Sequence, residues 1–338
     1  MKLSSRTLQR DQGRHIRSIA AQALHSSPRE RCMHHCIAGC PRLYEPFLVD
    51  DPARFPHSGI NMDAIPLPSY EAAALDSIAE GLTGLRILFV NVFAIANPEG
   101  SWCLIDAGIY LSAGKIKKWA EDHFGGDTKP AAIILTHGHF DHVGAIESLL
   151  EDWDVPVYAH TDELPYLTGR AKYPPPDPSV GGGLMAVMSP LYPRTSANLS
   201  GRVQPLPADN SVPTLDGWQY IHTPGHAPGH VSLFRPEDRT LVVGDAFCTT
   251  KQESFLAVAK QTPELHGPPA YYTPDWDAAR RSVEKLAALR PLTIAPGHGL
   301  PMTGEAVPDQ LQQLALEFDR IAMPGHGKYV HQASTSAS

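Results

Sequence analysis

The sequence predicts an α/β protein whose β-sheets are covered by helices on their outer faces. Paired strands come first along the chain, and strands mixed with amphipathic helices follow them. The strands are short apolar runs, rich in β-branched residues and bounded by polar or turn-forming residues, as buried strands are. A chain of 338 residues is long enough to bury a sizeable core.

The first half of this pattern begins with two strands joined by the turn sequence Asn-Pro-Glu-Gly at 97–100. An amphipathic helix follows, because Ile116, Trp119 and Phe124 share one face. The elements expected here are strands at 85–95, 101–106, 131–135 and 155–159, and helices at 113–124 and 145–150.

In the second half of the chain, strands and helices alternate again after an irregular segment. Residues 169–201 are rich in Pro and Gly, and so long an irregular segment in a compact domain is typically functional or mobile. The elements expected after it are strands near 218–223, 230–234, 239–244 and 292–295, and helices at 275–289 and 307–321.

We expect one domain at 61–330, which contains the insertion at 169–201, and a disordered tail at 331–338. The leader, residues 1–60, is basic near its start and lacks the apolar run of a secretory signal. It is expected to be disordered, or a spurious extension before a start at Met33 or Met62. An organelle transit peptide also fits its composition. Its cysteines, which match no common zinc spacing, are not expected to bind metal: Cys32, Cys36 and Cys40.

The composition argues against two classes of partner. The net charge of −8 disfavours nucleic acid, which a basic face would bind. No apolar run approaches the ~18–20 residues that a membrane span needs. We therefore expect a cytoplasmic protein that acts on a small-molecule substrate, with its oligomeric state left open.

The strongest functional signal is the stretch 136–142, Thr-His-Gly-His-Phe-Asp-His. It directly follows the apolar run 131–135, so three imidazoles and a carboxylate are placed where a strand ends. Without a bound cation these groups would lose hydration at a high cost and the imidazoles would repel one another. The stretch therefore predicts a metal site, with candidate ligands His137, His139, Asp141 and His142.

Three further candidate ligands stand at the ends of later strands: His226, Asp245 and His298. A glycine precedes each one, which lets the backbone turn sharply and present the next side chain. The repeated device argues for one shared site. His326 competes with His298 but follows a helix, and His230 is expected to support the site without binding metal.

This set of residues resembles the metallo-β-lactamase superfamily, whose signature is His-x-His-x-Asp-His with a later His, Asp and His. The resemblance covers roughly residues 85–300 and implies an αββα sandwich of two mixed β-sheets flanked by helices. It also implies two divalent metal ions. The first would be held by His137, His139 and His226, the second by Asp141, His142 and His298, with Asp245 as the bridge and Asp106 supporting the histidine loop.

Imidazole and carboxylate ligands without thiolate suit zinc, iron or manganese, and zinc is favoured here. Two ions ~3.5–4 Å apart can share a hydroxide that attacks a carbonyl carbon. Asp141 is the predicted catalytic residue, because it can orient that nucleophile or pass on its proton. The expected activity is hydrolysis of a small ester, lactone or thioester.

With an aspartate, Asp245, at the bridging position, the chain resembles the glyoxalase-II-like hydrolases and the acyl-homoserine lactonases more than the β-lactamases. Glutathione thioesters are disfavoured, because residues 299–338 contain only Arg320 and Lys328 as basic side chains. Lactonases commonly carry a tyrosine three positions after the bridge, where this chain has Cys248. A substitute donor for the oxyanion could come from one of the tyrosines Tyr166, Tyr192, Tyr271 and Tyr272.

Two alternative activities belong to the same superfamily. An iron-dependent dioxygenase would use mainly the first metal, so one iron per chain would favour it. A β-lactamase-type enzyme would hydrolyse an amide instead of an ester. A nuclease would need basic patches, and a binding module without catalysis would be expected to have lost some ligands, whereas every motif here is intact.

Overall fold

The computed structural model describes residues 72–194, 197–261 and 263–330. All the described residues lie in one compact unit, which spans Pro66–Ser338. The expectations for the leader, its cysteine cluster and the tail concern residues outside the described part, and they stay predictions.

The first sheet has seven strands in the order β1-β2-β3-β4-β5-β6-β7. Their bounds are β1 Ala72–Ala79, β2 Leu82–Ile87, β3 Val90–Ala96, β4 Trp102–Ile105, β5 Ala132–Ile134, β6 Val157–Ala159 and β7 Val203–Pro205. Strands β1 to β4 pair antiparallel, whereas β4 to β7 pair parallel. Because β4 and β5 are parallel, their carboxyl ends share one edge, which places Asp106 beside the histidine stretch.

The second sheet has six strands in the order β13-β12-β11-β10-β9-β8. Their bounds are β8 Ser211–Val212, β9 Leu215–His222, β10 Val231–Arg235, β11 Thr240–Gly244, β12 Thr293–Pro296 and β13 Met302–Thr303. The parallel pair in this sheet is β11 with β12. Asp245 and His298, which follow these two strands, therefore lie at the same edge.

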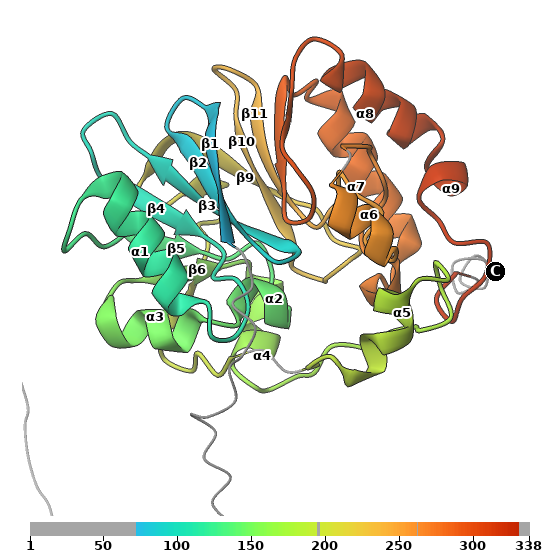
Figure 1. The fold of residues 1–338 in the computed structure, drawn as a ribbon, viewed down its shortest axis with the longest axis horizontal. Helices are drawn as coiled ribbons and strands as arrows, with labels where there is room; N and C mark the ends of the chain where they lie inside the picture. The colour runs from blue at the N-terminus through green and yellow to red at the C-terminus, as the bar shows by residue number, and fades with distance from the viewer. Residues whose placement is uncertain (1–71, 195–196, 262, 331–338) are drawn as a thin grey trace, which may run out of the picture. The chain divides into compact units, whose positions relative to one another are not determined.

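Helices cover the outer faces of both sheets. In Figure 1, α1 (Ala113–Phe124) and α3 (Ile146–Asp152) lie beside β4–β6, and α7 (Trp276–Ala288) and α8 (Val307–Leu316) lie on the side of the second sheet. Helix α7 begins at Trp276 because Asp275 caps it, its side chain accepting a hydrogen bond from Ala278 N at 2.8 Å. The shorter helices are α2 Phe140–Val143, η2 Thr161–Glu163, α4 Leu164–Leu167, α5 Leu184–Met188, η3 Ser189–Leu191, α6 Phe255–Lys260, η4 Ala270–Tyr272 and α9 Phe318–Ile321.

The buried side chains show the layers directly, because neighbours along one strand enter different cores. In β4, Leu104 packs with Ile116 of α1, whereas Ile105 packs in a cluster between the sheets. In β11, Val242 joins that inter-sheet cluster, whereas Val243 packs in the core that includes α7 and α8. This period-two alternation gives helix, sheet, sheet and helix layers, and it confirms the predicted αββα sandwich.

Two predicted elements have other bounds in the structure, and several strands, β1 among them, were missed. Residues 85–95 are not one strand, because the chain turns at Leu88, whose φ is 58°, and β2 and β3 pair across that turn. Strand β1 was missed because its sequence, AAALDSIA, has few of the residue types that favour strands. The helix expected at 307–321 is two helices, α8 and α9, separated at Glu317.

The insertion at 169–201 packs against the domain at several points. Tyr173, Val180 and Ala186 are buried, whereas Leu184 and Leu191 are exposed. Among the described residues, no helix is both long and apolar enough to cross a membrane.

Candidate metal centre

The seven predicted ligands come from four strand ends and lie together. The stretch after β5 supplies His137 and His139 and runs into α2, which carries Asp141 and His142. The other three follow β9, β11 and β12, as His226, Asp245 and His298. All seven are buried, and Asp141 is the most exposed at 7%.

The ligand atoms gather in two sets. In the first set, His137, His139 and His226, the atoms lie within 4.8 Å of one another, as they do in the second set, Asp141, His142 and His298. His137 and His142 also form such a group with Asp245, which joins the two sets.

Asp245 lies between the two sets. Its Oδ2 is 3.4 Å from His226 Nε2 of the first set, and 3.5 Å and 3.1 Å from His142 Nε2 and His298 Nε2 of the second. Gly297 makes room for this carboxylate, because a Cβ at that position would lie 2.3 Å from Asp245 Oδ1. A glycine is therefore required at position 297, because the backbone there passes close to the carboxylate of Asp245.

Hydrogen bonds fix the orientation of four of the five imidazoles. His142 Nδ1 donates to Asp106 Oδ2 at 2.8 Å, and His298 Nδ1 donates to Phe89 O at 2.6 Å. His137 Nδ1 lies 3.0 Å from Thr136 Oγ1, and His226 Nδ1 lies 3.3 Å from Thr273 Oγ1. Both hydroxyls donate elsewhere, to Asp106 and to Pro269 O, so each must accept from its imidazole. The Nε2 lone pair of each ring then faces the centre, where that of His226 lies 2.9 Å from His139 Nδ1.

Unpartnered polar atoms in the centre test whether a cation fits there. His137 Nε2, His142 Nε2 and Asp245 Oδ1 are buried without a hydrogen-bond partner among the described residues. An unpartnered buried polar atom costs about 1–3 kcal/mol, so three of them in one cluster need a ligand that accepts their lone pairs. A divalent metal ion bound by imidazoles and carboxylates meets that need.

The protonation of the first set also suits a cation. Burial lowers the pKa of His139 to about 3, and burial with neighbouring imidazoles lowers the pKa values of His137 and His226 well below their usual range. These rings are neutral at pH 7, the form that binds metal. In the second set, burial opposes the charge of Asp245 and favours neutral imidazoles. The attraction of opposite charges outweighs burial there, so the pKa of Asp245 lies well below its usual range, whereas the pKa values of His142 and His298 are raised.

Asp106 and His230 support the centre as expected from the sequence. Asp106 accepts from Thr136 N at 2.7 Å as well as from His142, so it holds the start and the end of the histidine stretch. His230 Nε2 accepts from Asp245 N at 2.7 Å, which fixes the backbone of the bridge residue. His326 is placed elsewhere, with its Nε2 3.0 Å from Ser179 O, and His298 takes the position in the centre.

Glu163 is a supporting residue that the sequence did not reveal. It is fully buried, and its carboxylate accepts from Gly138 N at 2.9 Å and from Gly229 N at 2.8 Å. These two amides belong to the loops that carry the first set. Tyr173 of the insertion donates to the same carboxylate, and burial raises the pKa of both Glu163 and Tyr173. A lone Glu in a polar segment carries no pattern that marks such a role.

The tyrosines expected near the centre are arranged unequally. Tyr272 packs its ring on His139, with centroids 4.8 Å apart, and its hydroxyl is buried without a partner among the described residues. Tyr192 donates to Met185 Sδ at 3.7 Å, and Tyr166 stacks on Tyr173. Cys248 is buried, and burial raises the pKa of its thiol well above the usual range.

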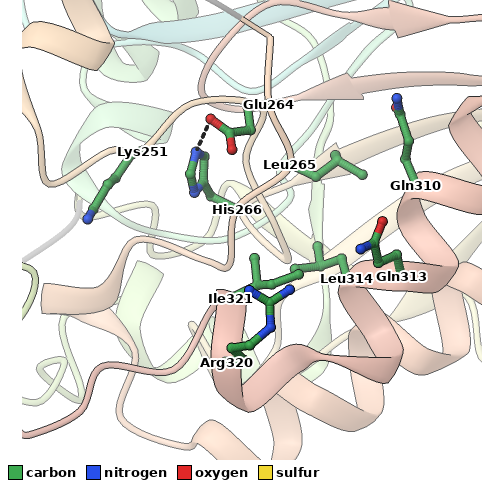
Figure 2. A pocket seen from close by; sticks show the side chains of 9 residues that line it. All are labelled: Lys251, Glu264, Leu265, His266, Gln310, Gln313, Leu314, Arg320 and Ile321. Atoms are coloured by element: carbon green, nitrogen blue, oxygen red, sulfur yellow. Dashed lines mark ion pairs between the residues drawn. The ribbon is translucent and has the colours of Figure 1, made fainter.

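A separate cavity of about 470 Å³ lies next to the loop that follows Asp245 (Figure 2). Its polar lining includes His266, which pairs with Glu264 at 3.6 Å, and Arg320, which is already paired with Glu317. The loop joins the centre through Thr249 N, which donates to His298 O at 3.2 Å. None of the seven candidate ligands lines this cavity.

Comparisons with known proteins agree with this geometry. A family model described as the metallo-beta-lactamase superfamily matches residues 85–298. The probable metallo-hydrolase YflN of Bacillus subtilis is 51% identical over 259 residues, which cover 76% of this chain and 98% of that protein. The probable metallo-hydrolase YybB of the same organism is 31% identical over 60% of this chain and 81% of that protein.

A solved beta-lactamase domain protein from Burkholderia ambifaria shares the fold, with a TM-score of 0.50 at 19% identity, over 76% of this chain and 78% of that one. The chain therefore belongs to the metallo-beta-lactamase superfamily, as a metallo-hydrolase.

Proposed function

We propose that this chain hydrolyses a small ester, lactone or thioester with two divalent metal ions, for which zinc is favoured over iron or manganese. The observation that carries the proposal is the position of Asp245, whose single Oδ2 lies 3.1–3.5 Å from imidazoles of both ligand sets. A carboxylate placed in this way suits a bridge between two ions.

The seven ligands would hold the two ions, whose chemistry there would be the activation of water at neutral pH and the polarisation of a carbonyl group. Asp141 is the proposed catalytic residue among the side chains. Its Oδ2 lies 3.5 Å from His298 Nε2, and burial raises the pKa of its carboxyl group. Placed in this way, it can orient the nucleophile or accept its proton.

Tyr272 is the proposed donor to the developing oxyanion. Burial and the charge of Asp141 raise the pKa of its hydroxyl, which therefore stays protonated and able to donate. The hydroxyl has no partner in the described part of the chain, and its ring lies against His139 of the first set. The position taken by tyrosine in the lactonases is Cys248 here, and that buried thiol is too weak a donor to replace it.

The charge around the ligands favours an uncharged substrate. The segments 131–150, 222–234, 240–250 and 291–319 contain no Lys or Arg, although they carry all seven ligands. A polyanion such as nucleic acid or a phosphorylated compound would need cations there. A small neutral acyl compound needs none.

A substrate panel tests the proposal. Protein freed of metal with a chelator, then reloaded with zinc, manganese or iron in turn, is assayed against lactones, thioesters, aryl esters and β-lactams. We expect hydrolysis of at least one ester, lactone or thioester, lost on chelation and restored by metal. Hydrolysis restricted to β-lactams would contradict the proposal and support a β-lactamase-type amide hydrolase. Oxygen consumption with one iron per chain would support the dioxygenase instead.

A further inference from the structure

Six of the ten large apolar side chains that are exposed in the described part of the chain lie on three short helices. They are Leu184, Val187 and Met188 of α5, Leu191 of η3, and Phe255 and Leu256 of α6. We call these six side chains the apolar patch, and their exposed fractions range from 40% to 74%. Single exposed apolar side chains need no explanation, but a group of this kind marks a binding surface.

The two parts of the apolar patch adjoin at the start of α5 and α6, the helices labelled in Figure 1. Gly183 caps the start of α5, and a Cβ there would lie 1.7 Å from Glu253 O and 3.1 Å from Ser254 N, at the start of α6. Five of the six residues of α6 are apolar, yet none of them is buried. A surface helix normally buries its apolar face, so α6 has apolar surface available for a further contact.

The surroundings of the apolar patch in the sequence are uncharged. The segments 178–193 and 254–259 contain no Asp, Glu, Lys, Arg or His. Glu253, which precedes the second segment, is buried, and its Oε1 accepts from Ala270 N at 2.7 Å. A charged or strongly polar group that lost its hydration against this surface would gain no partner in return. The patch therefore favours an apolar occupant.

Aromatic side chains connect the apolar patch with the candidate centre. Tyr192, which follows η3, donates to Met185 Sδ of α5 at 3.7 Å. Its ring centroid lies 5.5 Å from that of Phe140, which stands between two ligands, and 6.4 Å from that of Tyr272. The ring of Tyr272 packs on His139 of the first set, at 4.8 Å. The patch is thus separated from the ligands by a short row of aromatic rings.

We propose that the apolar patch binds the acyl chain of the substrate, which makes the substrate an ester, lactone or thioester of a medium- or long-chain acid. The inference rests on the proposed function, because the carbonyl group would lie at the centre while its chain runs past the aromatic rings toward α5. Burial of each methylene group strengthens binding about 3- to 4-fold. A second copy of this chain is the other candidate occupant, and the position of the patch beside the centre favours the acyl chain.

Binding of straight-chain carboxylates tests the proposal. Butanoate, hexanoate, octanoate and decanoate, the acids that hydrolysis of such substrates would release, are titrated into the zinc-loaded full chain by calorimetry below their micellar concentrations. We expect the dissociation constant to fall by about 3- to 10-fold with each added pair of methylene groups, because a chain on an open surface is partly buried. The gain should end when the chain extends beyond the patch.

Two patch variants and a matched control show where the chain binds. Leu191→Ser and Phe255→Ser remove exposed side chains from the two parts of the patch, so their melting temperatures should match that of the wild type. We expect the dissociation constant of decanoate to rise about 5-fold or more in each, and that of butanoate to change much less. Leu316→Ser removes a leucine of α8 that is 77% exposed and lies outside the patch, and it should bind all four acids like the wild type.

Two kinds of result would overturn the proposal. One is an affinity that does not rise with chain length in the wild type, or that rises as steeply in both patch variants. The other is a wild-type dimer, detected by sedimentation, that dissociates in Leu191→Ser while chain length has no effect on binding. That outcome would assign the patch to a second copy of the chain.

Hydrolysis of the 4-nitrophenyl esters of the same acids separates this inference from the proposed function. We expect kcat/KM to rise with chain length in the wild type, and less steeply in the two patch variants. Hydrolysis that is independent of chain length would contradict this inference alone. Binding that depends on chain length, without hydrolysis of any ester, lactone or thioester, would contradict the proposed function and leave the patch as a binding site for apolar acids.

Discussion

Asp245 is the residue on which the arrangement of the other ligands depends. Its carboxylate faces imidazoles of both sets, and His230 fixes its backbone amide. At this scale the sequence was highly informative. All seven predicted ligands lie in one buried cluster. They could be predicted because both signals are local in the sequence: the dense stretch at 136–142, and a glycine before each of the other three ligands at a strand end. Whether they bind two ions stays a prediction.

Asp141→Ala tests the catalytic assignment. The change removes one ligand of the second set and the most exposed carboxylate of the centre. We expect bound metal to fall toward one ion per chain and kcat to fall by about 100-fold or more. Asp216→Ala, at an exposed carboxylate outside the centre, is the control and should retain both. Metal content and kcat that match the wild type in Asp141→Ala would show that the site is misassigned.

Tyr272→Phe tests the proposed oxyanion donor. The variant loses only a hydroxyl that has no partner in the described part of the chain, so the melting temperature should not fall. We expect kcat to fall by about 100-fold while the metal content is kept. Tyr192→Phe removes a hydroxyl that contacts Met185 and should change kcat much less. Equal kcat values for Tyr272→Phe and the wild type would eliminate Tyr272 as the donor.

At the scale of elements, the loops at the strand ends are held by buried carboxylates. Asp106, which follows β4, accepts a hydrogen bond from Thr136 N at the start of the histidine stretch. Glu163 accepts from the amides of Gly138 and Gly229 and so holds their two loops together. Tyr173 connects the insertion to Glu163. The insertion therefore contributes to the support of the ligands of the first set.

Glu163→Ala tests this support. It leaves the buried amide of Gly229 without its acceptor, at a cost of about 1–3 kcal/mol, and leaves Gly138 N only the hydroxyl of Tyr173, so the melting temperature should fall. We expect metal affinity to fall by about 10–100-fold, as when outer partners of ligands are removed. Glu253→Gln is the control, because that buried carboxylate binds Ala270 N, outside the ligand loops. Metal affinity that is unchanged in Glu163→Ala would contradict a positioning role.

The elements differed in how well the sequence predicted them. The helix at 113–124 was confirmed with its bounds, because its apolar face is strongly periodic. The turn at Leu88 was missed, because leucine rarely adopts a positive φ and nothing in its sequence marks the hairpin. The role of Glu163 was missed because it depends on contacts with residues 25 and 66 positions away.

At the scale of the whole molecule, the αββα sandwich brings the ends of strands from both sheets to one place. The family resemblance predicted this architecture, and the core clusters confirm it. The substrate could not be predicted, because the metal ligands determine the reaction whereas the surrounding loops determine the fit. Those loops include the insertion, whose sequence has no periodic pattern.

Metal analysis of desalted, zinc-loaded protein is the most direct test of the two-ion centre. We predict about two tightly bound ions per chain in the wild type, with hydrolysis lost as they are removed. The Asp245→Ala variant should retain fewer ions, because its carboxylate faces both ligand sets. A wild-type protein that holds one ion or none, or an Asp245→Ala variant that still holds two, would contradict the account.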